Sequence, residues 1–198
     1  MTIVTNIDKL KQPCVSNSSN EYNEEVATKL FNIMNPLDDC IGLACNQIGI
    51  TNARVCVVNV KEPLYFINPE IVDKDKEIYF VESCLSFPGK SVKTKRHKQI
   101  TIKADNLNEG GQVFCPSNDN DHLGLLEVVA IQHEVAHLNG ETMYDYEVEK
   151  QKPAKTEQTF QPNEKIQITD GKESKWMKWK KARSLIDSGK WKIYSQSQ

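Results

Sequence analysis

Hydrophobic residues recur at helical spacing in two stretches of the chain. The first covers residues 20–35, opens with acidic residues and ends at Pro36, with apolar positions at Ala27, Leu30, Phe31 and Met34. The second runs from about Leu123 to Leu138, where Asn139-Gly140 forms a stop signal. The pattern therefore predicts an amphipathic helix near the N-terminus and a second helix in the last third of the chain.

Runs of β-branched and aromatic residues between these helices predict strands, because they are separated by clusters of Asn, Asp, Gly and Pro. The runs cover residues 54–60, 64–72, 78–85, 99–104 and 112–115. We expect an α+β fold in which antiparallel β-sheets surround the second helix, with an N-terminal helix and a basic C-terminal extension.

Charge divides the chain near residue 148. Residues 1–148 contain 13 Lys and Arg against 21 Asp and Glu, whereas residues 149–198 contain 12 against 6. We expect a catalytic domain over residues 1–147, then, over residues 148–198, a polar linker to about Gly171 and a basic helix within 172–187. The basic residues of that helix are interpreted as a solvated face, with RNA as the alternative partner.

The whole-chain totals exclude several functional classes. The formal net charge of the 198 residues is −2, so we expect no dedicated nucleic-acid binding. No run approaches the ~18 apolar residues of a membrane span, so we expect no membrane crossing. The N-terminus resembles neither a signal nor a transit peptide, and the six cysteines read as reduced thiols, which together predict a cytoplasmic protein.

The sharpest feature is His133-Glu134-Val135-Ala136-His137, an HExxH pattern inside the second predicted helix. At 3.6 residues per turn, the two histidines lie one above the other on one face, where their imidazoles can bind one divalent metal ion. Glu134 lies about 100° round the helix, which suits a general base beside a metal-bound water. The pattern therefore predicts metal-dependent hydrolysis.

A third ligand decides among the metallohydrolases. One peptidase class carries a histidine three residues after Gly140, but this position is Met143. Another class uses a downstream glutamate, for which Glu157 and Glu164 are available in the polar linker. The upstream alternative is Cys84, because a thiolate with two imidazoles leaves one position open, as in catalytic zinc sites.

Three motifs of this chain occur in the order found in the peptide deformylase family. Glu82-Ser-Cys-Leu-Ser86 resembles the family's EGCLS motif, and Gln132-His-Glu-Val-Ala-His-Leu-Asn-Gly140 resembles its QHExxHxxG motif. Upstream, Gly42-Leu-Ala-Cys-Asn-Gln47 resembles the end of GxGLAAxQ, and Ile67-Asn-Pro-Glu-Ile71 resembles a connecting strand. The resemblance covers residues 5–147.

The resemblance implies a formylmethionine deformylase, a hydrolase that removes the N-formyl group from formyl-methionyl peptides and releases formate. Cys84, His133 and His137 would hold one divalent metal ion per chain, Fe²⁺ natively, with Zn²⁺, Ni²⁺ or Co²⁺ as replacements. A metal-bound water would attack the formyl carbon with Glu134 as general base and then general acid. Because family members act on nascent chains, the resemblance also suggests the ribosome as a partner of the basic tail.

The resemblance assigns further roles in the site. The Gln47 side-chain amide and the Leu85 backbone N–H would donate to the oxyanion, and Glu82 and Gln132 would orient the ligands. Arg96 matches a position near the substrate entrance, although the basic run around it reads as a solvated strand. The pocket for the methionine side chain would be lined by Ile41, Gly42, Phe80, Ser83, Leu126, Val129 and Ala130.

Three residues depart from the family motifs. Cys40 replaces the first Gly of the first motif, Cys45 replaces its second Ala, and Ser83 replaces the Gly before the ligand cysteine. A cysteine at position 40 could stiffen a turn that usually relies on glycine. These changes affect the substrate edge and leave every expected ligand in place.

Two other functions stay open at this point. Another HExxH metallopeptidase would need a third ligand from residues 149–198, so deletion of the tail would remove its metal ion. A binding protein that keeps a metal fold without catalysis would have no use for Glu134 as a base.

Overall fold

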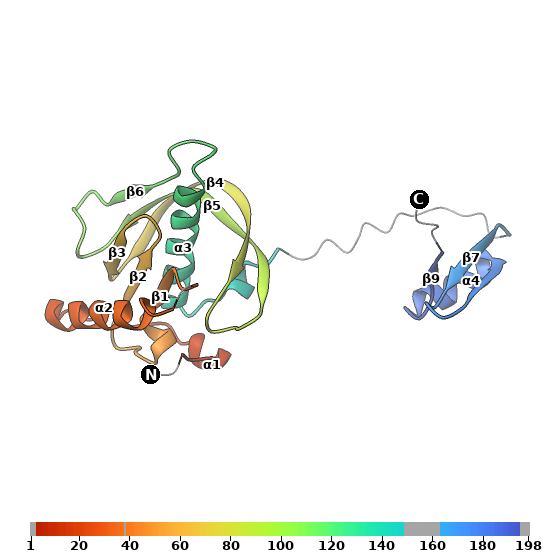
Figure 1. Cartoon of the computed structure of the whole chain (residues 1–198), viewed down its shortest axis with the longest axis horizontal. Coiled ribbons are helices and arrows are strands. Elements are labelled where there is room, and N and C mark those ends of the chain that lie inside the picture. Colours follow the sequence, from red (N-terminus) through yellow and green to blue (C-terminus); the bar gives the residue numbers. More distant parts are fainter. Residues whose placement is uncertain (1–2, 38, 149–162, 195–198) are drawn as a thin grey trace. The chain divides into compact units, whose positions relative to one another are not determined.

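The computed structural model describes residues 3–37, 39–148 and 163–194 and divides the chain into two units, Met1–Glu149 and Lys150–Gln198 (Figure 1). The helices of the first unit are α1 (Ile7–Leu10), α2 (Asn20–Met34) and α3 (His122–Leu138), with 3₁₀ turns η1 (Cys45–Ile48) and η2 (Met143–Tyr146). Its strands are β1 (Gly42–Ala44), β2 (Val55–Asn59), β3 (Pro63–Ile67), β4 (Glu70–Ser83), β5 (Ser91–Lys103) and β6 (Gln112–Phe114).

Two antiparallel sheets enclose α3 in this unit. The strand orders are β1-β2-β3 and β4-β5-β6, and α3 contacts β1 and β2 of one sheet and β4, β5 and β6 of the other. Figure 1 shows α3 running between the β1–β3 sheet and the long β4–β5 hairpin. This arrangement confirms the α+β fold with a central HExxH helix.

Helix α3 begins and ends at residues suited to each terminus. The Asp121 side chain caps the N-terminus by accepting a hydrogen bond from the Gly124 backbone N–H at 2.8 Å. Gly140, with φ of 76°, follows the C-terminus, where a Cβ would lie 2.6 Å from the Lys11 carbonyl oxygen. Val128, Ile131, Val135 and Leu138 belong to the main hydrophobic core. Both helix faces are thus buried, which fixes the histidines of α3 in the interior.

The β4–β5 hairpin is longer than the sequence pattern predicted. The expected strand 64–72 is interrupted, because Asn68 adopts a left-handed φ of 51° and Glu70 starts a new strand that runs without a break to Ser83. Strand β5 starts at Ser91, directly opposite Ser83. The connecting turn therefore carries Cys84 at the end of a long hairpin whose pairing shifts register between Ile71 and Asp73 and then continues to Ser83.

The second unit contains a small sheet where the sequence predicted a linker and a helix. Its elements are β7 (Lys165–Thr169), β8 (Ser174–Lys178), α4 (Trp179–Asp187) and β9 (Lys192–Ile193), with strand order β8-β7-β9. Ile166, Ile168 and Ala182 form its buried core. The expected helix over 172–187 is thus a strand followed by a shorter helix, and the linker expectation over 149–162 lies outside the described residues.

No helix within the described residues combines the length and the apolar composition that a membrane span needs.

Candidate active site

Cys84, His133 and His137 converge in the interior of the first unit. Their ligand atoms all lie within 4.8 Å of one another, and Cys84 Sγ is 3.3 Å from His137 Nε2. Donor atoms bound about 2.0–2.3 Å from one tetrahedral ion are roughly 3.3–3.8 Å apart. The sulfur and the two imidazoles therefore fit one metal ion, and all three residues are buried. Among the described residues, Cys84 supplies the third member of this cluster; Glu157 lies outside them.

Cys84 is held by packing beyond the end of β4. Its side chain clusters with Val92 of β5 and Met143 of η2, against Phe87 in the turn. The Phe87 backbone N–H donates to the Cys84 carbonyl at 2.9 Å, which closes the turn. Met143 stands where one peptidase class has a ligand histidine, and here its side chain supports Cys84.

A buried ion network orients His133. Its Nδ1 is 2.6 Å from Glu82 Oε2, which leaves Nε2 for the metal side. Glu82 also accepts two hydrogen bonds from Arg96, from Nε at 2.6 Å and from Nη2 at 2.9 Å, and a short one from the Thr94 hydroxyl. Each charged group has a partner, so the network can exist in a dry interior.

The titration of these groups follows from burial and pairing. Burial alone would raise the pKa of Glu82, but hydrogen bonds from His133 and Arg96 lower it to about 2. Burial alone would lower the pKa of His133, but hydrogen bonds to Cys84 and Glu82 raise it to about 10. Burial and the neighbouring His133 hold the pKa of His137 well below its usual range. A metal ion binding here would displace the proton on His133.

The carboxyl group of Glu134 is buried beside the cluster and is a weaker acid than an ordinary glutamate. Burial raises its pKa to about 7, near the value that suits proton transfer at neutral pH. Its Oε2 is buried without a hydrogen-bond partner among the described residues. A Cβ at Gly42 would lie 2.6 Å from its Oε1, so a glycine at position 42 leaves the room that Glu134 occupies.

Gln47 connects the first motif to the cysteine ligand. Its Oε1 accepts a hydrogen bond from the Ala44 backbone N–H at 2.8 Å, which fixes the amide orientation. Its Nε2 then donates to Cys84 Sγ at 3.5 Å and to Ser86 Oγ at 3.2 Å. The amide N–H groups of Gln47 are therefore held beside Cys84, one of the three candidate metal ligands.

These residues share a pocket of about 430 Å³ with the expected substrate residues. The pocket is lined by Gln47, Cys84, Leu85, His133 and Glu134 together with Ile41, Gly42, Phe80, Ser83, Leu126, Val129 and Ala130. Glu82 lies at its wall, whereas His137 is fully buried behind it. Gln132 lies on the other side of α3, where its side-chain amide bonds the His97 backbone N–H and carbonyl of β5 at 3.0 and 2.8 Å.

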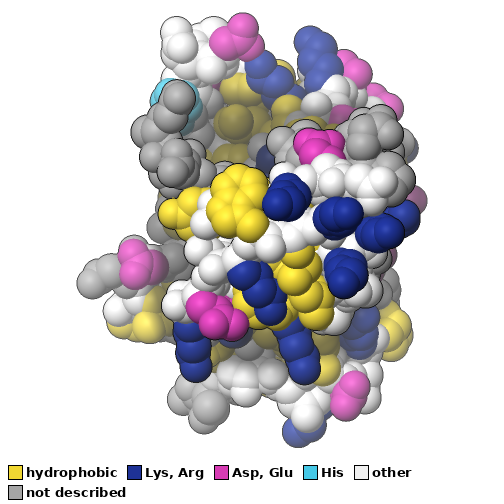
Figure 2. All heavy atoms as spheres, turned by 90° about the vertical axis from the view of Figure 1, so that its right-hand side faces the viewer, with side chains coloured by type: hydrophobic (Ala, Val, Ile, Leu, Met, Phe, Trp, Pro, Cys, Tyr) yellow, Lys and Arg dark blue, Asp and Glu magenta, His cyan; other side chains and the backbone are white. Residues whose placement is uncertain are grey.

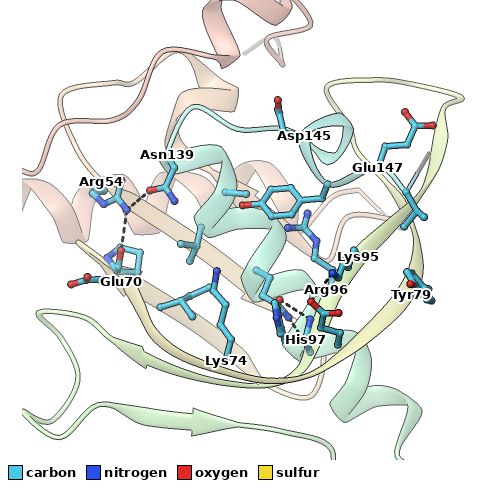
Figure 3. Close-up of a pocket in the computed structure, with 18 of the residues that line it drawn as sticks. Arg54, Glu70, Lys74, Tyr79, Lys95, Arg96, His97, Asn139, Asp145 and Glu147 are labelled. Atoms are coloured by element: carbon cyan, nitrogen blue, oxygen red, sulfur yellow. Dashed lines mark hydrogen bonds and ion pairs between the residues drawn. The ribbon is translucent and has the colours of Figure 1, made fainter. Parts of the chain in front are cut away.

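A larger groove of about 830 Å³ lies on the opposite side of α3 and contains none of the metal ligands (Figure 3). Its lining includes Arg96, whose guanidinium carbon is 3.8 Å from the centre of the Tyr146 ring. The interpretation of the basic run as a solvated strand is therefore wrong for Arg96, which is only 2% exposed. Its buried guanidinium instead stacks on Tyr146 and pairs with Glu82, behind the metal ligands.

The three departures from the family motifs fit the structure. Cys40 is not in a left-handed conformation, and its thiol donates to the Gly42 carbonyl at 3.3 Å. Cys45 is buried, with its Sγ 3.5 Å from that of Cys14. The Ser83 hydroxyl bonds that of Ser91 across the hairpin at 2.9 Å.

Sequence reasoning gave no role to several residues that hold the site together. Thr94 and Ser86 contact Glu82 and Gln47, and both are buried. Asn46 donates from Nδ2 to the backbone carbonyls of Leu10 and His137, at 3.2 and 2.6 Å. Asn46 and Ser86 stand inside the motifs, which was a usable signal, whereas Thr94 lies outside all of them. The partners of Asn46 and Ser86 lie far away along the chain.

Replacement of Arg96 by leucine should destabilise the protein strongly. The substitution leaves the buried Glu82 carboxylate without its cationic partner, so we expect the free energy of unfolding to fall by about 3–5 kcal/mol. Urea denaturation of the two proteins measures this loss. Lys95→Leu, at the exposed neighbouring position, should change stability far less. Equal effects of the two substitutions would contradict the structural role of the Arg96–Glu82 pair.

Comparison with known proteins gives a consistent result. Residues 2–153 match the model of the family described as polypeptide deformylase. A peptide deformylase from Hamiltonella defensa is 38% identical over 139 residues, covering 68% of this chain and 74% of that protein. One from Dictyoglomus turgidum is 42% identical over 110 residues, covering 55% of this chain and 67% of that protein.

Solved structures agree with the sequence relatives. The peptide deformylase of Thermotoga maritima is 27% identical with a TM-score of 0.60, and the match covers 75% of this chain and 97% of that one. The peptide deformylase of the Vibrio parahaemolyticus bacteriophage VP16T, in complex with actinonin, is 27% identical with a TM-score of 0.59, covering 72% and 99%. The family match ends at residue 153, before the sheet of the second unit.

Proposed function

Because this chain belongs to the polypeptide deformylase family, we propose that it removes the N-formyl group from nascent peptides in the pocket around Cys84, His133 and His137. The enzyme is a hydrolase that splits the formyl amide into formate and a free α-amine. The observation that carries the proposal is the convergence of three ligand atoms within 4.8 Å beside the buried Glu134. We assign this activity to residues 1–147.

Cys84, His133 and His137 would hold the metal ion, which would lower the pKa of a water molecule to make it a nucleophile and would polarise the formyl carbonyl. Mixed sulfur and nitrogen ligation suits ferrous iron or zinc, and we propose Fe²⁺ as the native ion, replaceable by Zn²⁺, Ni²⁺ or Co²⁺. Activity of an iron–thiolate centre should fall in air, and added reductant should slow the loss. Indifference to oxygen would favour zinc.

Glu134 would carry the proton through the reaction. With its pKa raised to about 7, the carboxylate can accept a proton from water at neutral pH and then donate it to the departing nitrogen. The carboxyl oxygen Oε2, which lacks a partner among the described residues, is the atom available for this transfer.

Gln47 and Leu85 would stabilise the negative charge that develops on the formyl oxygen. The Ala44 backbone N–H fixes the orientation of the Gln47 amide before the substrate arrives. Its Nε2 is therefore already held beside Cys84 and Ser86, and one of its N–H groups would turn from these partners to the formyl oxygen. The peptide N–H of Leu85 follows directly after the ligand Cys84 and belongs to the same pocket wall.

The pocket wall would select the side chain that follows the formyl group. Leu126, Val129 and Ala130 extend the His133 face of α3, and Phe80 and Ile41 come from the neighbouring strand and loop. An unbranched apolar side chain such as methionine suits a wall of this composition.

Replacement of Gln47 by alanine should lower kcat roughly a hundredfold, because loss of one oxyanion donor typically costs ~3 kcal/mol. Steady-state kinetics of formate release measures the change, and metal content should stay near one ion per chain. A variant with normal kcat, or one that loses its metal ion, would refute the assignment of Gln47 to the oxyanion.

The activity is tested with protein purified without oxygen and assayed for formate release from formyl-Met-Ala-Ser. Acetyl-Met-Ala-Ser is the matched control, because it keeps the peptide and changes only the acyl group. We expect formate from the first peptide, no reaction with the second, and loss of activity with a chelator. Actinonin, which is bound in the bacteriophage relative, should inhibit the reaction. Internal peptide cleavage without formate release would instead indicate a metallopeptidase.

The location and the partner of the enzyme belong to the same proposal. All six cysteines are free thiols, which supports a reducing cytoplasm as its location. The ribosome is proposed as a partner of the basic C-terminal residues, and unchanged ribosome binding after removal of residues 172–198 would disprove it.

A further inference from the structure

The small sheet of the second unit is covered on one face. Side chains of β7 alternate, so Ile166 and Ile168 point to the face where Ala182 of α4 completes the buried core. Met177 and Ile193, which are paired with Ile166 and Ile168 in the neighbouring strands, pack against the same core. The residues between them must therefore point to the opposite face.

That opposite face, which we call the open face, carries two exposed aromatic rings. Trp176 of β8 is paired with Gln167 of β7 and is 66% exposed. Tyr194 donates its backbone N–H to the Gln167 carbonyl at 2.9 Å, which places it beside Gln167 on the other side, and it is 42% exposed. Trp176, Gln167 and Tyr194 thus form a row across the three-stranded sheet.

Lysines lie on both sides of this row, in the directions along the strands. Lys165 of β7 and Lys178 of β8 are paired with each other on one side, and Lys192 of β9 is paired with Thr169 on the other. All three lysines are exposed, and none forms an ion pair with a carboxylate in the described part of the chain. The open face therefore combines two rings with three lysines that form no ion pair within the described ranges.

The charge of the whole unit has the same sign. Residues 163–194 contain nine Lys and Arg against four Asp and Glu, a net charge of +5, whereas residues 1–148 carry −8. Figure 2, which views the molecule from the right-hand side of Figure 1, shows Lys and Arg side chains gathered around exposed hydrophobic ones on the near face. The net charge of the whole chain, −2, does not reveal this local excess of positive charge.

We propose that the open face binds single-stranded nucleic acid, with bases stacked on Trp176 and Tyr194 and phosphates held by Lys165, Lys178 and Lys192. Exposed rings on a sheet face flanked by cations match the two needs of an unpaired strand, a stacking surface and a positive path for the backbone. An acidic peptide would use the lysines and leave the rings exposed, and a duplex keeps its bases out of reach. The whole-chain expectation of no dedicated nucleic-acid binding is revised by this proposal.

The binding test uses the full chain and a fluorescein-labelled 12-nucleotide oligouridylate, followed by fluorescence anisotropy. Binding of a 12-nucleotide DNA oligothymidylate is measured in the same way, to show whether the open face prefers RNA or DNA. Binding of either single strand supports the proposal. A duplex of the same length and heparin should bind more weakly than the single strand. Absence of binding to both single strands, or preference for the duplex or heparin, would overturn it.

Variants of the open face separate stacking from charge. Trp176→Ala should weaken binding about 10- to 100-fold, because base stacking on one ring contributes that much, and Trp176→Phe should keep most of the affinity. Circular dichroism and formate release should be unchanged in both, since Trp176 is largely exposed and lies outside the catalytic unit. Wild-type affinity in Trp176→Ala would contradict the proposal.

A matched pair of triple variants controls for net charge. Lys165, Lys178 and Lys192 changed together to glutamine should weaken binding and reduce its salt dependence. The same change at Lys172, Lys180 and Lys181 removes equal charge from the turn after β7 and from α4. We expect the first triple to lose at least about ten times more affinity than the second. Equal losses would mean nonspecific attraction to the whole unit and would refute the open face as the site.

Discussion

Glu134→Ala should lower kcat for formate release by at least about a thousandfold and leave close to one metal ion per chain. General acid–base groups typically contribute 10²–10⁴-fold, and Glu134 is expected to handle both proton transfers of this reaction. Its carboxyl group is buried, has a pKa raised to about 7, and offers Oε2 without a partner among the described residues. Formate assays and metal analysis on the same preparations measure the two effects.

Glu127 offers a matched control on the same helix. It is also a buried glutamate of α3, but it pairs with Lys61 and lies outside the active-site pocket. Glu127→Ala should therefore keep kcat within about threefold of the wild-type value. If Glu134→Ala retained comparable activity, Glu134 could not be the proton carrier. Loss of the metal ion in Glu134→Ala would show instead that it holds the ligands in place.

Cys84→Ala should abolish activity through loss of the metal ion. It removes the sulfur from a cluster of three ligand atoms within 4.8 Å of one another. Loss of an outer-shell partner of a ligand already weakens metal binding about 10- to 100-fold, so loss of the ligand itself should cost at least a hundredfold. Metal titration of the purified protein measures the change, and formate release should fall with metal content.

Cys115→Ala is the control, because Cys115 is a free, exposed thiol outside the cluster. Both metal content and kcat should stay at wild-type values in this variant. A Cys84→Ala protein with a full complement of metal and normal turnover would mean that another residue completes the coordination. In that case Glu157 or Glu164 would become the candidate ligand, and the metallopeptidase interpretation would return.

The central helix illustrates what periodicity can predict. The expected helix from about Leu123 to Leu138 is observed as His122–Leu138, ended by the predicted Asn139-Gly140 signal. Helical spacing is a local property, so the sequence placed His133 and His137 on one face. The third cluster member, Cys84, lies 49 residues before His133. Ligand chemistry made it one candidate beside Glu157 and Glu164, and the motif resemblance selected it, because no local pattern links positions so far apart.

Arg96 shows where local reasoning fails. It stands in a basic run that reads as a solvated strand, yet its side chain is only 2% exposed. The strand pairing places Arg96 opposite Ile78 of β4, close enough to Glu82 for a buried ion pair. A charged residue can be buried in the core when an oppositely charged residue from elsewhere in the fold pairs with it. Composition cannot reveal that partner.

The second unit differs from the expected linker and helix for a related reason. Lys165–Thr169 has two isoleucines in alternation among polar residues, and its polar composition predicted a linker. The strand forms because β8 and β9 pair with it and α4 covers its apolar face. Short strands gain their stability from such neighbours rather than from their own residues.

The sequence by itself determined the central helix, the placement of His133 and His137 on one face with Glu134 beside them, and the family to which residues 2–153 belong. These features depend on residue types at short, fixed spacing, which the helix repeat converts directly into geometry. The tertiary structure alone decided that Arg96 supports Glu82 from behind and that Trp176 and Tyr194 share an open sheet face. Those relations join residues through strand pairing and burial, and both depend on the folded chain as a whole.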